Sequence, residues 1–469
     1  MIWDFIKYSN KIAIIQDNQQ QLSYGEIFSL IVNLSKVIPQ RSLVFCLCQN
    51  SIGSLIGYIS FIKNHVVPLL LDEHIDKTLL EKFILLYSPQ FLWLPTERKH
   101  EFSGHVIYSL YGYSLLKLNN SKKHEINSKL ALLITTSGST GSPKLVRQSY
   151  NNIEANTKSI VEFLALDSTE RVITTLPMNY TYGLSIINTH LAVGATILLT
   201  NKTIIQREFW NFFTEQKATS FGGVPYTYEM LDKLLFFRRK LPYLRTMTQA
   251  GGKISFSLHR KFAEYAQKEH KRFIVMYGQA EATARMAYLP PEKSLEKCGA
   301  AGIAIPGGNF KLFGDDGSEV VGPNETGELV YFGPNVSMGY ALTSLDLAKG
   351  DEFNGVLKTG DLAKFDEDGF IYIVGRKKRF LKIFGNRIGL DETELLIKNK
   401  FPSIKCACSG KDDAMYVFIN DKKNILEVKK FLSEKTHLNQ SAFHIKFIDR
   451  IPVNESGKIL YRKLEQFYD

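Results

Sequence analysis

The sequence contains few cysteines and no export signal. Its five cysteines are an odd number in a chain of 469 residues, and the opening MIWDFIKYSN places Asp4 where a secretory signal is apolar. We therefore expect no disulfide framework and a cytoplasmic location. The pairs Cys46 and Cys48, and Cys406 and Cys408, alternate within apolar segments, a pattern typical of packed strands rather than of a metal site.

Long apolar runs and clustered charge are also missing. No window approaches the unbroken apolar stretch that a membrane crossing needs, so we expect no membrane span. The formal net charge is +11, but the Lys and Arg residues are scattered and form no basic stripe interleaved with aromatic residues. This distribution argues against nucleic-acid binding. The surplus suits anionic small molecules or an acidic protein partner instead.

Strand-like apolar segments alternate with helical patterns through the first two thirds of the chain. SLVFCLC precedes SIGSLIGYISFIKNHVV, and RVITTLP precedes YGLSIINTHLAVG. Repeated strand, loop and helix units predict parallel sheets covered by helices, with ligands beyond the carboxyl ends of the strands. We expect the loops at these ends to meet at one crevice: TTSGSTG, LPMNYTYG, GGVPY, QAGG and YGQAE.

The pattern changes after about residue 290. Short segments with turn signals, such as GELVYFG and GFIYIVG, predict a β-rich subdomain, and a compact α+β pattern follows the basic segment at 376–379. A chain of this length is expected to hold a large domain and a smaller one. We predict an α/β fold with a large N-terminal domain of helix-covered sheets at residues 1–376, which includes the β-rich subdomain, and a small α+β C-terminal domain at 377–469.

A loop rich in Ser, Thr and Gly follows the apolar run LALLI. The segment TTSGSTGSPKLV, at 135–146, offers backbone N–H groups and hydroxyls to an anion, with charge from Lys144 and Arg147. The spacing of Gly138, Gly141 and Lys144 does not fit a Walker A motif. Taken alone, this loop has a flexible surface turn as its alternative interpretation.

Further segments make the chain resemble the adenylate-forming enzymes. This superfamily comprises acyl- and aryl-CoA synthetases, peptide-synthetase adenylation domains and firefly luciferase. The resemblance covers nearly the whole chain and rests on motifs in family order: Thr136–Lys144, Tyr277-Gly-Gln-Ala-Glu281, Gly327-Glu-Leu with Gly339-Tyr, Thr359-Gly-Asp361, Gly375-Arg376 and Glu455-Ser-Gly-Lys458-Ile.

The resemblance implies ATP and Mg²⁺ as cofactors. A carboxylic acid would attack the α-phosphate of ATP to give an acyl-adenylate, with Glu281 holding Mg²⁺. Asp361 would accept hydrogen bonds from the ribose hydroxyls, which suits an acceptor-only group, and Arg376 would also touch ribose. An exposed glutamate and a turn-forming aspartate are the alternatives for Glu281 and Asp361. The implied nucleotide-binding residues are Thr136, Ser137, Gly138, Ser139, Thr140, Gly141, Lys144, Gly251, Gly252, Tyr277, Gly278, Gln279, Ala280, Asp361 and Arg376.

Lys458 is implied as the catalytic cation of the first step. Its ammonium would approach the α-phosphate and the attacking carboxylate from a mobile small domain, where a basic tail is the alternative interpretation. The family's hinge falls on Lys378, and Lys382 and Gly385 belong to the segment that would swing in afterwards. Gly385 would let a pantetheine thiol pass close to the backbone.

Ala280 departs from the family pattern, which usually has Thr at this position. The missing hydroxyl would slow catalysis about 10²-fold if nothing replaces it, and Thr283 is a candidate substitute. A protein that binds nucleotide or a partner without turnover is therefore an alternative function. The retained Glu281, Asp361 and Lys458 favour an enzyme.

The segment at 179–185 bears on the acid. Amino-acid-activating members have an Asp where Gly183 stands, so an acid without an α-amino group, fatty or aryl, is expected. The expected acyl pocket, for which core packing is the alternative at each position, comprises Tyr182, Gly183, Leu184 and Gly223, with Tyr180, Gly222 and Tyr228 as further candidates. We predict an acid–thiol ligase that uses coenzyme A, or alternatively the phosphopantetheine of an acyl carrier protein.

Overall fold

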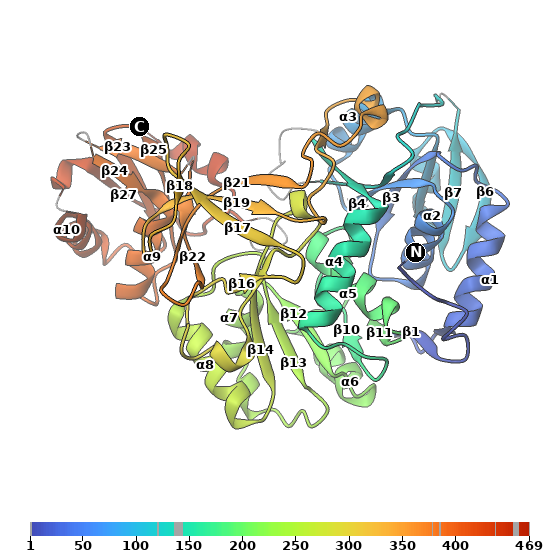
Figure 1. Cartoon of the computed structure of the whole chain (residues 1–469), viewed down its shortest axis with the longest axis horizontal. Helices are drawn as coiled ribbons and strands as arrows, with labels where there is room; N and C mark the ends of the chain where they lie inside the picture. Colours follow the sequence, from blue (N-terminus) through green and yellow to red (C-terminus); the bar gives the residue numbers. More distant parts are fainter. Residues whose placement is uncertain are drawn as a thin grey trace.

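The computed structural model describes residues 2–119, 122–135, 144–377, 379–383, 386–436, 438–453 and 459–468, without the side chains at 380, 382, 386 and 387. These residues form two large mixed sheets with helices between and around them, a separate antiparallel sheet, and a small α+β unit at the C-terminal end (Figure 1). Among the described residues, none of the helices combines the length and the apolarity that a membrane crossing requires.

One large sheet has the strand order β16-β15-β14-β13-β12-β10-β11-β1-β2. Its central strands are parallel, and β2, β15 and β16 pair antiparallel at the two sides. The bounds are β1 Ile12–Gln16, β2 Gln21–Ser23, β10 Arg171–Ile173, β11 Thr196–Leu199, β12 Ser220–Gly223, β13 Thr246–Gln249, β14 Arg272–Tyr277, β15 Ala287–Tyr288 and β16 Ile303–Ala304.

The other large sheet has the order β20-β9-β8-β4-β3-β5-β7-β6. β3, β4, β5 and β8 are parallel, and every residue of β3 is buried, as expected of a strand with both faces covered. The bounds are β3 Leu43–Cys48, β4 Val67–Asp72, β5 Phe91–Pro95, β6 Gly104–Leu110, β7 Tyr113–Leu118, β8 Leu130–Thr135, β9 Leu145–Ser149 and β20 Tyr340–Ala341.

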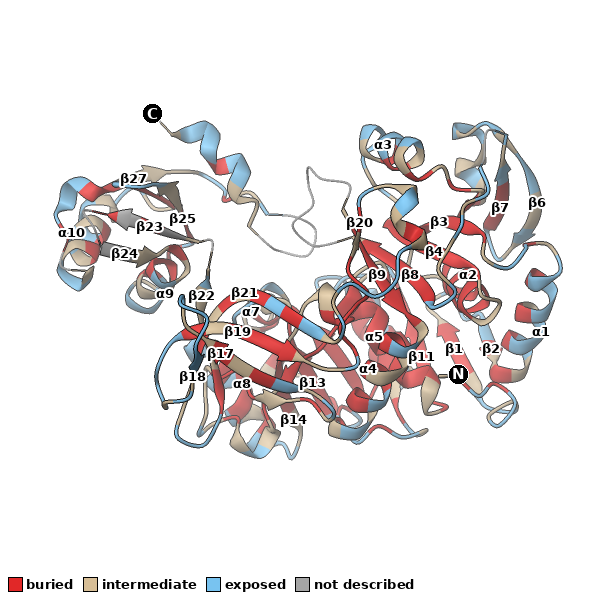
Figure 2. Ribbon diagram, turned by 45° about the horizontal axis from the view of Figure 1, so that its top comes forward, coloured by how far each residue is buried: buried red, intermediate tan, exposed pale blue. Residues whose placement is uncertain are grey.

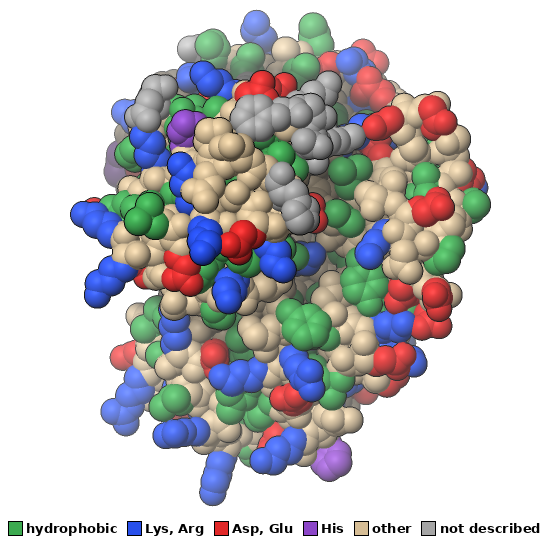
Figure 3. All heavy atoms as spheres, turned by 90° about the vertical axis from the view of Figure 1, so that its left-hand side faces the viewer, with side chains coloured by type: hydrophobic (Ala, Val, Ile, Leu, Met, Phe, Trp, Pro, Cys, Tyr) green, Lys and Arg blue, Asp and Glu red, His purple; other side chains and the backbone are tan. Residues whose placement is uncertain are grey.

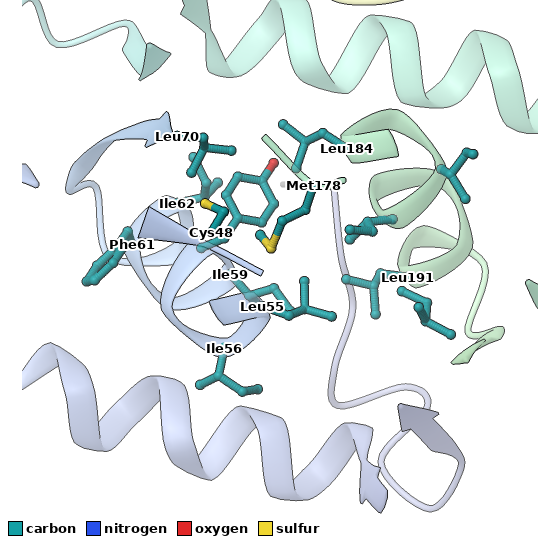
Figure 4. Close-up of a cluster of buried hydrophobic side chains, with 14 of the residues drawn as sticks. Cys48, Leu55, Ile56, Ile59, Phe61, Ile62, Leu70, Met178, Leu184 and Leu191 are labelled. Carbon is teal, nitrogen blue, oxygen red and sulfur yellow. The ribbon is translucent and has the colours of Figure 1, made fainter. Parts of the chain in front are cut away.

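The main core contains two helices that are buried on nearly all sides. In α2 all residues but Lys63 are buried, and α5 is buried throughout 181–191. The sequence of α2 is mostly apolar or small around the whole helix, and the buried Asn188 of α5 accepts a hydrogen bond from Tyr58 Oη of α2 at 2.9 Å. Side chains of the two helices belong to one buried cluster, and Figure 4 shows Leu55 of α2 and Leu184 of α5 in it together with Leu70 of β4. The helices are α1 Tyr24–Ser35, α2 Ile52–Lys63, α3 Lys77–Tyr87, α4 Tyr150–Phe163, α5 Thr181–Ala192, α6 Arg207–Glu215, α7 Pro225–Lys233, α8 Phe256–Lys268, α9 Leu390–Lys400 and α10 Ile425–Thr436.

The β-rich subdomain predicted after residue 290 is an antiparallel sheet of order β18-β17-β19-β21-β22. Its strands are β17 Asn309–Phe313, β18 Glu319–Val320, β19 Gly327–Phe332, β21 Val356–Phe365 and β22 Ile371–Arg376. In Figure 2 this sheet lies between the buried strands of the large sheets and the C-terminal unit. Its last strand ends at Arg376, two positions before the predicted hinge in the sequence.

The C-terminal unit has the predicted α+β composition. Strands β23 Phe380–Ile383 and β24 Asn386–Gly389 form a hairpin, while β25 Cys406–Lys411, β26 Ala414–Ile419 and β27 Phe443–Phe447 form a second sheet that packs on α9 and α10. The predicted fold class is thus confirmed, whereas the boundary at 376 and 377 remains a prediction.

Four of the five cysteines lie in the buried strands of the structure. The five cysteines are free, and Cys46, Cys48, Cys406 and Cys408 are buried in strands. The described residues hold no group of three or more His, Cys, Asp or Glu placed to bind a metal ion. On the face seen in Figure 3, Lys and Arg side chains lie among Asp and Glu side chains.

Candidate active site

Asp361 carries a buried carboxylate at the meeting point of two sheets. Its side chain accepts hydrogen bonds from Tyr277 Oη at 2.5 Å and Gln279 Nε2 at 2.8 Å, and Arg376 Nε lies 3.1 Å from its other oxygen. Arg376 stands opposite Asp361 in the β21–β22 pair, so strand register sets this ion pair. Burial raises the pKa of Asp361, and the charge of Arg376 opposes that shift. The structure thus brings together four residues that the sequence assigned to one nucleotide.

The glycines at the end of β13 line the same region. Gly251 has φ of 82°, and a Cβ there would lie 2.4 Å from Tyr180 Oη and 3.1 Å from Val224 Cγ1. Gln249 Nε2 donates to the Gly252 carbonyl at 2.9 Å, which fixes the turn. The loops after β10, β12 and β13 are therefore in contact, as the topology predicted.

The loop after β14 contacts strand β9 of the other large sheet. Gln148 Nε2 donates to the Ala280 carbonyl at 3.1 Å, and a Cβ on Gly278 would lie 1.8 Å from a carbonyl oxygen of the following segment. Thr283 is buried, and its hydroxyl donates to the Asn335 carbonyl at 2.7 Å. Thr283 is thus already engaged and does not replace the hydroxyl that Ala280 lacks.

Tyr340 links two residues expected to act on the phosphates. Its hydroxyl donates to Glu281 Oε1 at 3.0 Å, and Lys144 Nζ lies 3.2 Å from the centroid of its ring. Ser337 N holds the Glu281 backbone by donating to its carbonyl at 2.8 Å. Burial, followed by the Glu281 charge, raises the pKa of Tyr340, so the phenol stays a neutral donor. Sequence reasoning gave Tyr340 no role, although it quoted the Gly339-Tyr motif that contains it.

Arg147 does not supply charge to an anion, so that expectation is wrong. Its side chain is fully buried and pairs with Glu352 Oε2 at 2.5 Å. The remaining donors of its guanidinium are used by backbone carbonyl oxygens within 2.7–3.1 Å, those of Met338, Tyr340, Lys349 and Gly350. The side chain points into the protein and fixes the segment that carries Tyr340.

Two of the expected acyl-pocket residues have clear packing roles. Tyr182 Oη donates to Thr248 Oγ1 at 2.7 Å, which joins α5 to β13. A Cβ on Gly183 would lie 2.3 Å from the Pro177 carbonyl oxygen. Glycine is therefore required at 183 by backbone packing, which is a reason independent of the substrate.

The other expected pocket residues lie in or beside the core. Leu184 is buried and borders a cavity of about 10 Å³ between α4 and α5. A Cβ on Gly223 would lie 2.9 Å from the Thr227 side chain, and Tyr228 is buried with its hydroxyl on the Thr248 carbonyl at 2.7 Å. Core packing, the alternative weighed for these positions, describes Tyr228 best.

Arg285 is a buried residue that sequence reasoning missed. It is 2% exposed, and its guanidinium lies over the ring of Tyr182 with 4.8 Å between the Cζ atom and the ring centroid. Nε and Nη1 have no hydrogen-bond partner in the described part of the chain. The only signal in the sequence was a lone arginine in ATARMAY, directly after the motif that ends at Glu281.

Several expected residues lie outside the described residues. These are Lys378, Gly385, Lys458 and the loop residues Thr136, Ser137, Gly138, Ser139, Thr140 and Gly141; the side chain of Lys382 is likewise not described. The described residues on the two sides of this stretch of the sequence are hydrogen bonded to each other. Val453 forms an antiparallel bridge with Ile459, and Leu460 N donates to the Pro452 carbonyl at 2.8 Å. The roles of these residues remain predictions.

Comparison with known proteins decides the family. The model of the AMP-binding enzyme family matches residues 4–341. The chain belongs to the AMP-binding enzyme family. The 2-succinylbenzoate–CoA ligase of Bacillus licheniformis is 30% identical over 71% of this chain and 69% of that protein. The 4-coumarate–CoA ligase-like 2 protein of Arabidopsis thaliana is 29% identical over 71% of this chain but only 60% of its own length.

Solved structures share the fold of this AMP-binding enzyme. The o-succinylbenzoate CoA synthetase of Bacillus subtilis, in complex with its acyl-adenylate, superimposes with a TM-score of 0.80 at 21% identity, covering 98% of this chain and 96% of that one. ATP-bound MatB from Rhodopseudomonas palustris gives a TM-score of 0.79 at 19% identity, covering 99% and 97%. The expected relation to adenylate-forming enzymes is thereby confirmed.

Proposed function

We propose that this AMP-binding enzyme activates a carboxylic acid with ATP and transfers the acyl group to the thiol of coenzyme A in the cytoplasm. The observation that carries the proposal is the buried Asp361 carboxylate, held by Tyr277, Gln279 and Arg376 in a chain of this family. A ribose diol offers two O–H donors, the kind of partner that this carboxylate already accepts. Nucleotide would therefore exchange one set of donors for another without leaving the carboxylate unpaired.

Glu281 fits the part of a magnesium ligand. Mg²⁺ is commonly held by one or two carboxylates together with substrate phosphates rather than by a cage of protein ligands. The hydroxyl of Tyr340 orients the Glu281 carboxylate, and Lys144 lies over the ring of Tyr340, from where it would meet the phosphates. When bound, the ion would neutralise phosphate charge.

Lys458 would act in the first chemical step. A carboxylate oxygen of the acid forms a bond to the α-phosphorus, and the bond to the bridging oxygen breaks to release pyrophosphate. Negative charge crowds at this point, and an ammonium about 4 Å away contributes up to about 4 kcal/mol at an effective dielectric near 20. The glycine-rich loop at 136–141 would hold the departing phosphates.

The second step would transfer the acyl group to a thiol. The thiol adds to the acyl carbonyl, AMP leaves, and the thiol proton goes to solvent. We keep the hinge at Lys378 and the thiol passage beside Lys382 and Gly385 as part of this proposal, with the domains divided at 376 and 377. The names of the relatives, which are CoA ligases, support coenzyme A as the acceptor. The net charge of +11 supports an acidic acyl carrier protein as the alternative acceptor.

Pyrophosphate exchange into ATP tests the activation step. A panel of fatty, aryl and amino acids, including 2-succinylbenzoate and 4-coumarate, should give exchange with at least one acid lacking an α-amino group. Lys458→Ala should lower exchange about 10³-fold while AMP binding is kept. Lys463→Ala, an exposed lysine in the same C-terminal tail, is the matched control and should keep the parent rate.

The acceptor is tested separately with the best acid. Product should form with coenzyme A, and formation only with a phosphopantetheinylated carrier protein would favour the alternative. Exchange with amino acids alone would contradict the substrate class. Equal background exchange in the parent and in Lys458→Ala would favour a protein that binds nucleotide without turnover.

A further inference from the structure

Arg285 presents a buried cation with free hydrogen-bonding capacity. It is 2% exposed, and Nε and Nη1 carry three N–H hydrogens without a partner among the described residues. No carboxylate of the described residues lies within ion-pair distance of its guanidinium. An arginine stays charged in a protein, so this charge is neither removed nor neutralised within the described fold. Such a buried charge is costly unless something pairs with it.

The neighbours of Arg285 are polar and uncharged. The ring of Tyr182 faces the guanidinium, and burial followed by the Arg285 charge lowers the pKa of His190 to about 4, so that imidazole is neutral at pH 7. His190 Nε2 and Asn156 Oδ1 are buried and also lack hydrogen-bond partners in the described part of the chain. Asn156 holds the Arg285 carbonyl through its amide at 2.9 Å. These neighbours hold Arg285 in place, but none of them carries the negative charge that would pair with its guanidinium.

Arg285 borders the expected acyl pocket rather than the nucleotide residues. Tyr182, over which its guanidinium lies, reaches Thr248 with its hydroxyl, and a Cβ on Gly222 would lie 2.9 Å from that same hydroxyl. The guanidinium therefore contacts the Tyr182 side chain of α5, and that side chain in turn contacts the ends of β12 and β13. The charged groups of the nucleotide region, Asp361 and Glu281, already have partners of their own.

We propose that the acid substrate carries a second carboxylate and that Arg285 pairs with it while the first carboxylate reacts. The inference rests on the proposed function, because it names the substrate class of the same site. A carboxylate satisfies donors that are otherwise unpaired, and to reach them it has to displace the buried ring of Tyr182 from the guanidinium face. An analogue without the second charge leaves Arg285 unpaired, and sites of this kind reject such analogues by several powers of ten.

The test compares diacids with their half-esters. Isophthalate and adipate are symmetric, so each gives one monomethyl ester that keeps a reactive carboxylate and lacks the second charge. We expect kcat/KM in pyrophosphate exchange to be at least 10²-fold higher for one of these diacids than for its half-ester. Arg285→Met, which keeps length and removes charge, should lower kcat/KM for the diacid at least 10²-fold and reverse the preference, with KM for ATP unchanged.

A matched variant separates charge recognition from packing. Arg239 also lies over an aromatic ring, with 4.2 Å between its Cζ atom and the Trp210 centroid, and its Nε also lacks a partner, but it lies away from the expected pocket. Arg239→Met should keep the diacid preference. Thermal melting and AMP binding establish that both variants fold.

Each outcome decides the inference. A parent that prefers half-esters, or a diacid preference that survives in Arg285→Met, overturns it while leaving the ligase function intact. If no acid supports exchange, the proposed function fails. Calorimetric binding of isophthalate and adipate in the presence of AMP then decides the inference, since binding by the parent and not by Arg285→Met supports it, and equal or absent binding overturns it.

Discussion

Arg147 and Arg285 are both buried in the large N-terminal part of the protein, yet their surroundings differ. Arg147 is fully buried and uses its donors on Glu352 and on carbonyl oxygens of 338–350. Arg285 is 2% exposed and leaves Nε and Nη1 without partners in the described residues. Arg147 therefore has the contacts of a structural residue, whereas Arg285 has unpaired donors, which the proposal assigns to a substrate carboxylate.

The difference separates stability from recognition. A satisfied buried charge stabilises the fold only through its partners, because removing it leaves those partners without hydrogen bonds. An unsatisfied buried charge destabilises the free protein and becomes favourable when a ligand supplies the missing acceptor. Asp361 stands between the two cases, since it has partners that a ribose would replace under the proposed function.

The comparison predicts its largest effect for Arg147→Met. Carbonyl oxygens in the 338–350 segment lose their donor, so the free energy of unfolding should fall by about 3 kcal/mol or more. Urea unfolding monitored by intrinsic fluorescence measures this loss. Because the segment carries Tyr340, adenylation should fall in parallel, and a variant as stable as the parent would contradict the structural role of Arg147.

Asp361→Asn should weaken nucleotide binding without destabilising the protein. Loss of charge-assisted hydrogen bonds to ribose should raise the Kd for AMP about 10²-fold, measured by calorimetry.

Burial raises the pKa of Asp361 above its ordinary value of 3.8, so the folded protein binds this proton more tightly than the unfolded chain does. The parent therefore loses stability from this group as pH rises above about 4, and the Tm of Asp361→Asn relative to the parent should increase with pH.

Asp366→Asn is the matched control, at the residue that follows the same strand. Burial acts to raise the pKa of Asp366, but the hydrogen bond from Lys297 and further contacts hold it below its ordinary value. This aspartate contributes stability above about pH 4 that is lost as pH falls, so the variant should lose Tm at neutral pH and match the parent in acid. AMP binding should be unchanged, and the same pH trend in both variants would contradict the contrast.

Arg285→Met should raise stability while it removes diacid activation. Replacing an unpaired buried ion by an apolar side chain of similar size is commonly neutral or stabilising by about 1–4 kcal/mol. A rise in Tm of roughly 1 °C for each kcal/mol is expected by differential scanning calorimetry, because the entropy of unfolding is large for a chain of 469 residues. A fall as large as that of Arg147→Met would show that Arg285 is another structural tie.

The fold was largely predictable because its signals are local. Continuous apolar runs such as those of β3 and α2 identify elements buried on both sides, and Ser/Gly/Thr loops mark the carboxyl ends of parallel strands. Motif residues far apart in sequence, such as Tyr277 and Asp361, were assigned to one nucleotide, and the structure places them in hydrogen-bond contact. Resemblance supplied that pairing, since no spacing within the sequence determines it.

The missed features depend on contacts that a sequence does not display. Arg147 was assigned to an anion because its charge is visible, but its direction depends on partners 191–205 residues away. Thr283 was the candidate substitute for the hydroxyl that Ala280 lacks, but its own hydroxyl donates to the Asn335 carbonyl, 52 residues away. Arg285 stood in an unremarked segment, and only the structure shows that it is buried without partners.

The smallest expected effect is that of Tyr340→Phe. This variant tests whether a single hydrogen-bond partner of the Glu281 carboxylate affects Mg²⁺ binding when the burial of that carboxylate is unchanged. The variant keeps the ring beneath Lys144 and removes only the hydrogen bond to Glu281. A less firmly oriented carboxylate should raise the Mg²⁺ concentration for half-maximal pyrophosphate exchange by up to about tenfold. Tyr331→Phe removes a hydrogen bond of the same kind, to Asn335 Oδ1 at 2.9 Å, and should leave the Mg²⁺ dependence unchanged. Equal Mg²⁺ profiles for both variants and the parent would mean that Glu281 is oriented by its backbone contact to Ser337, and that the phenol of Tyr340 has only a packing role.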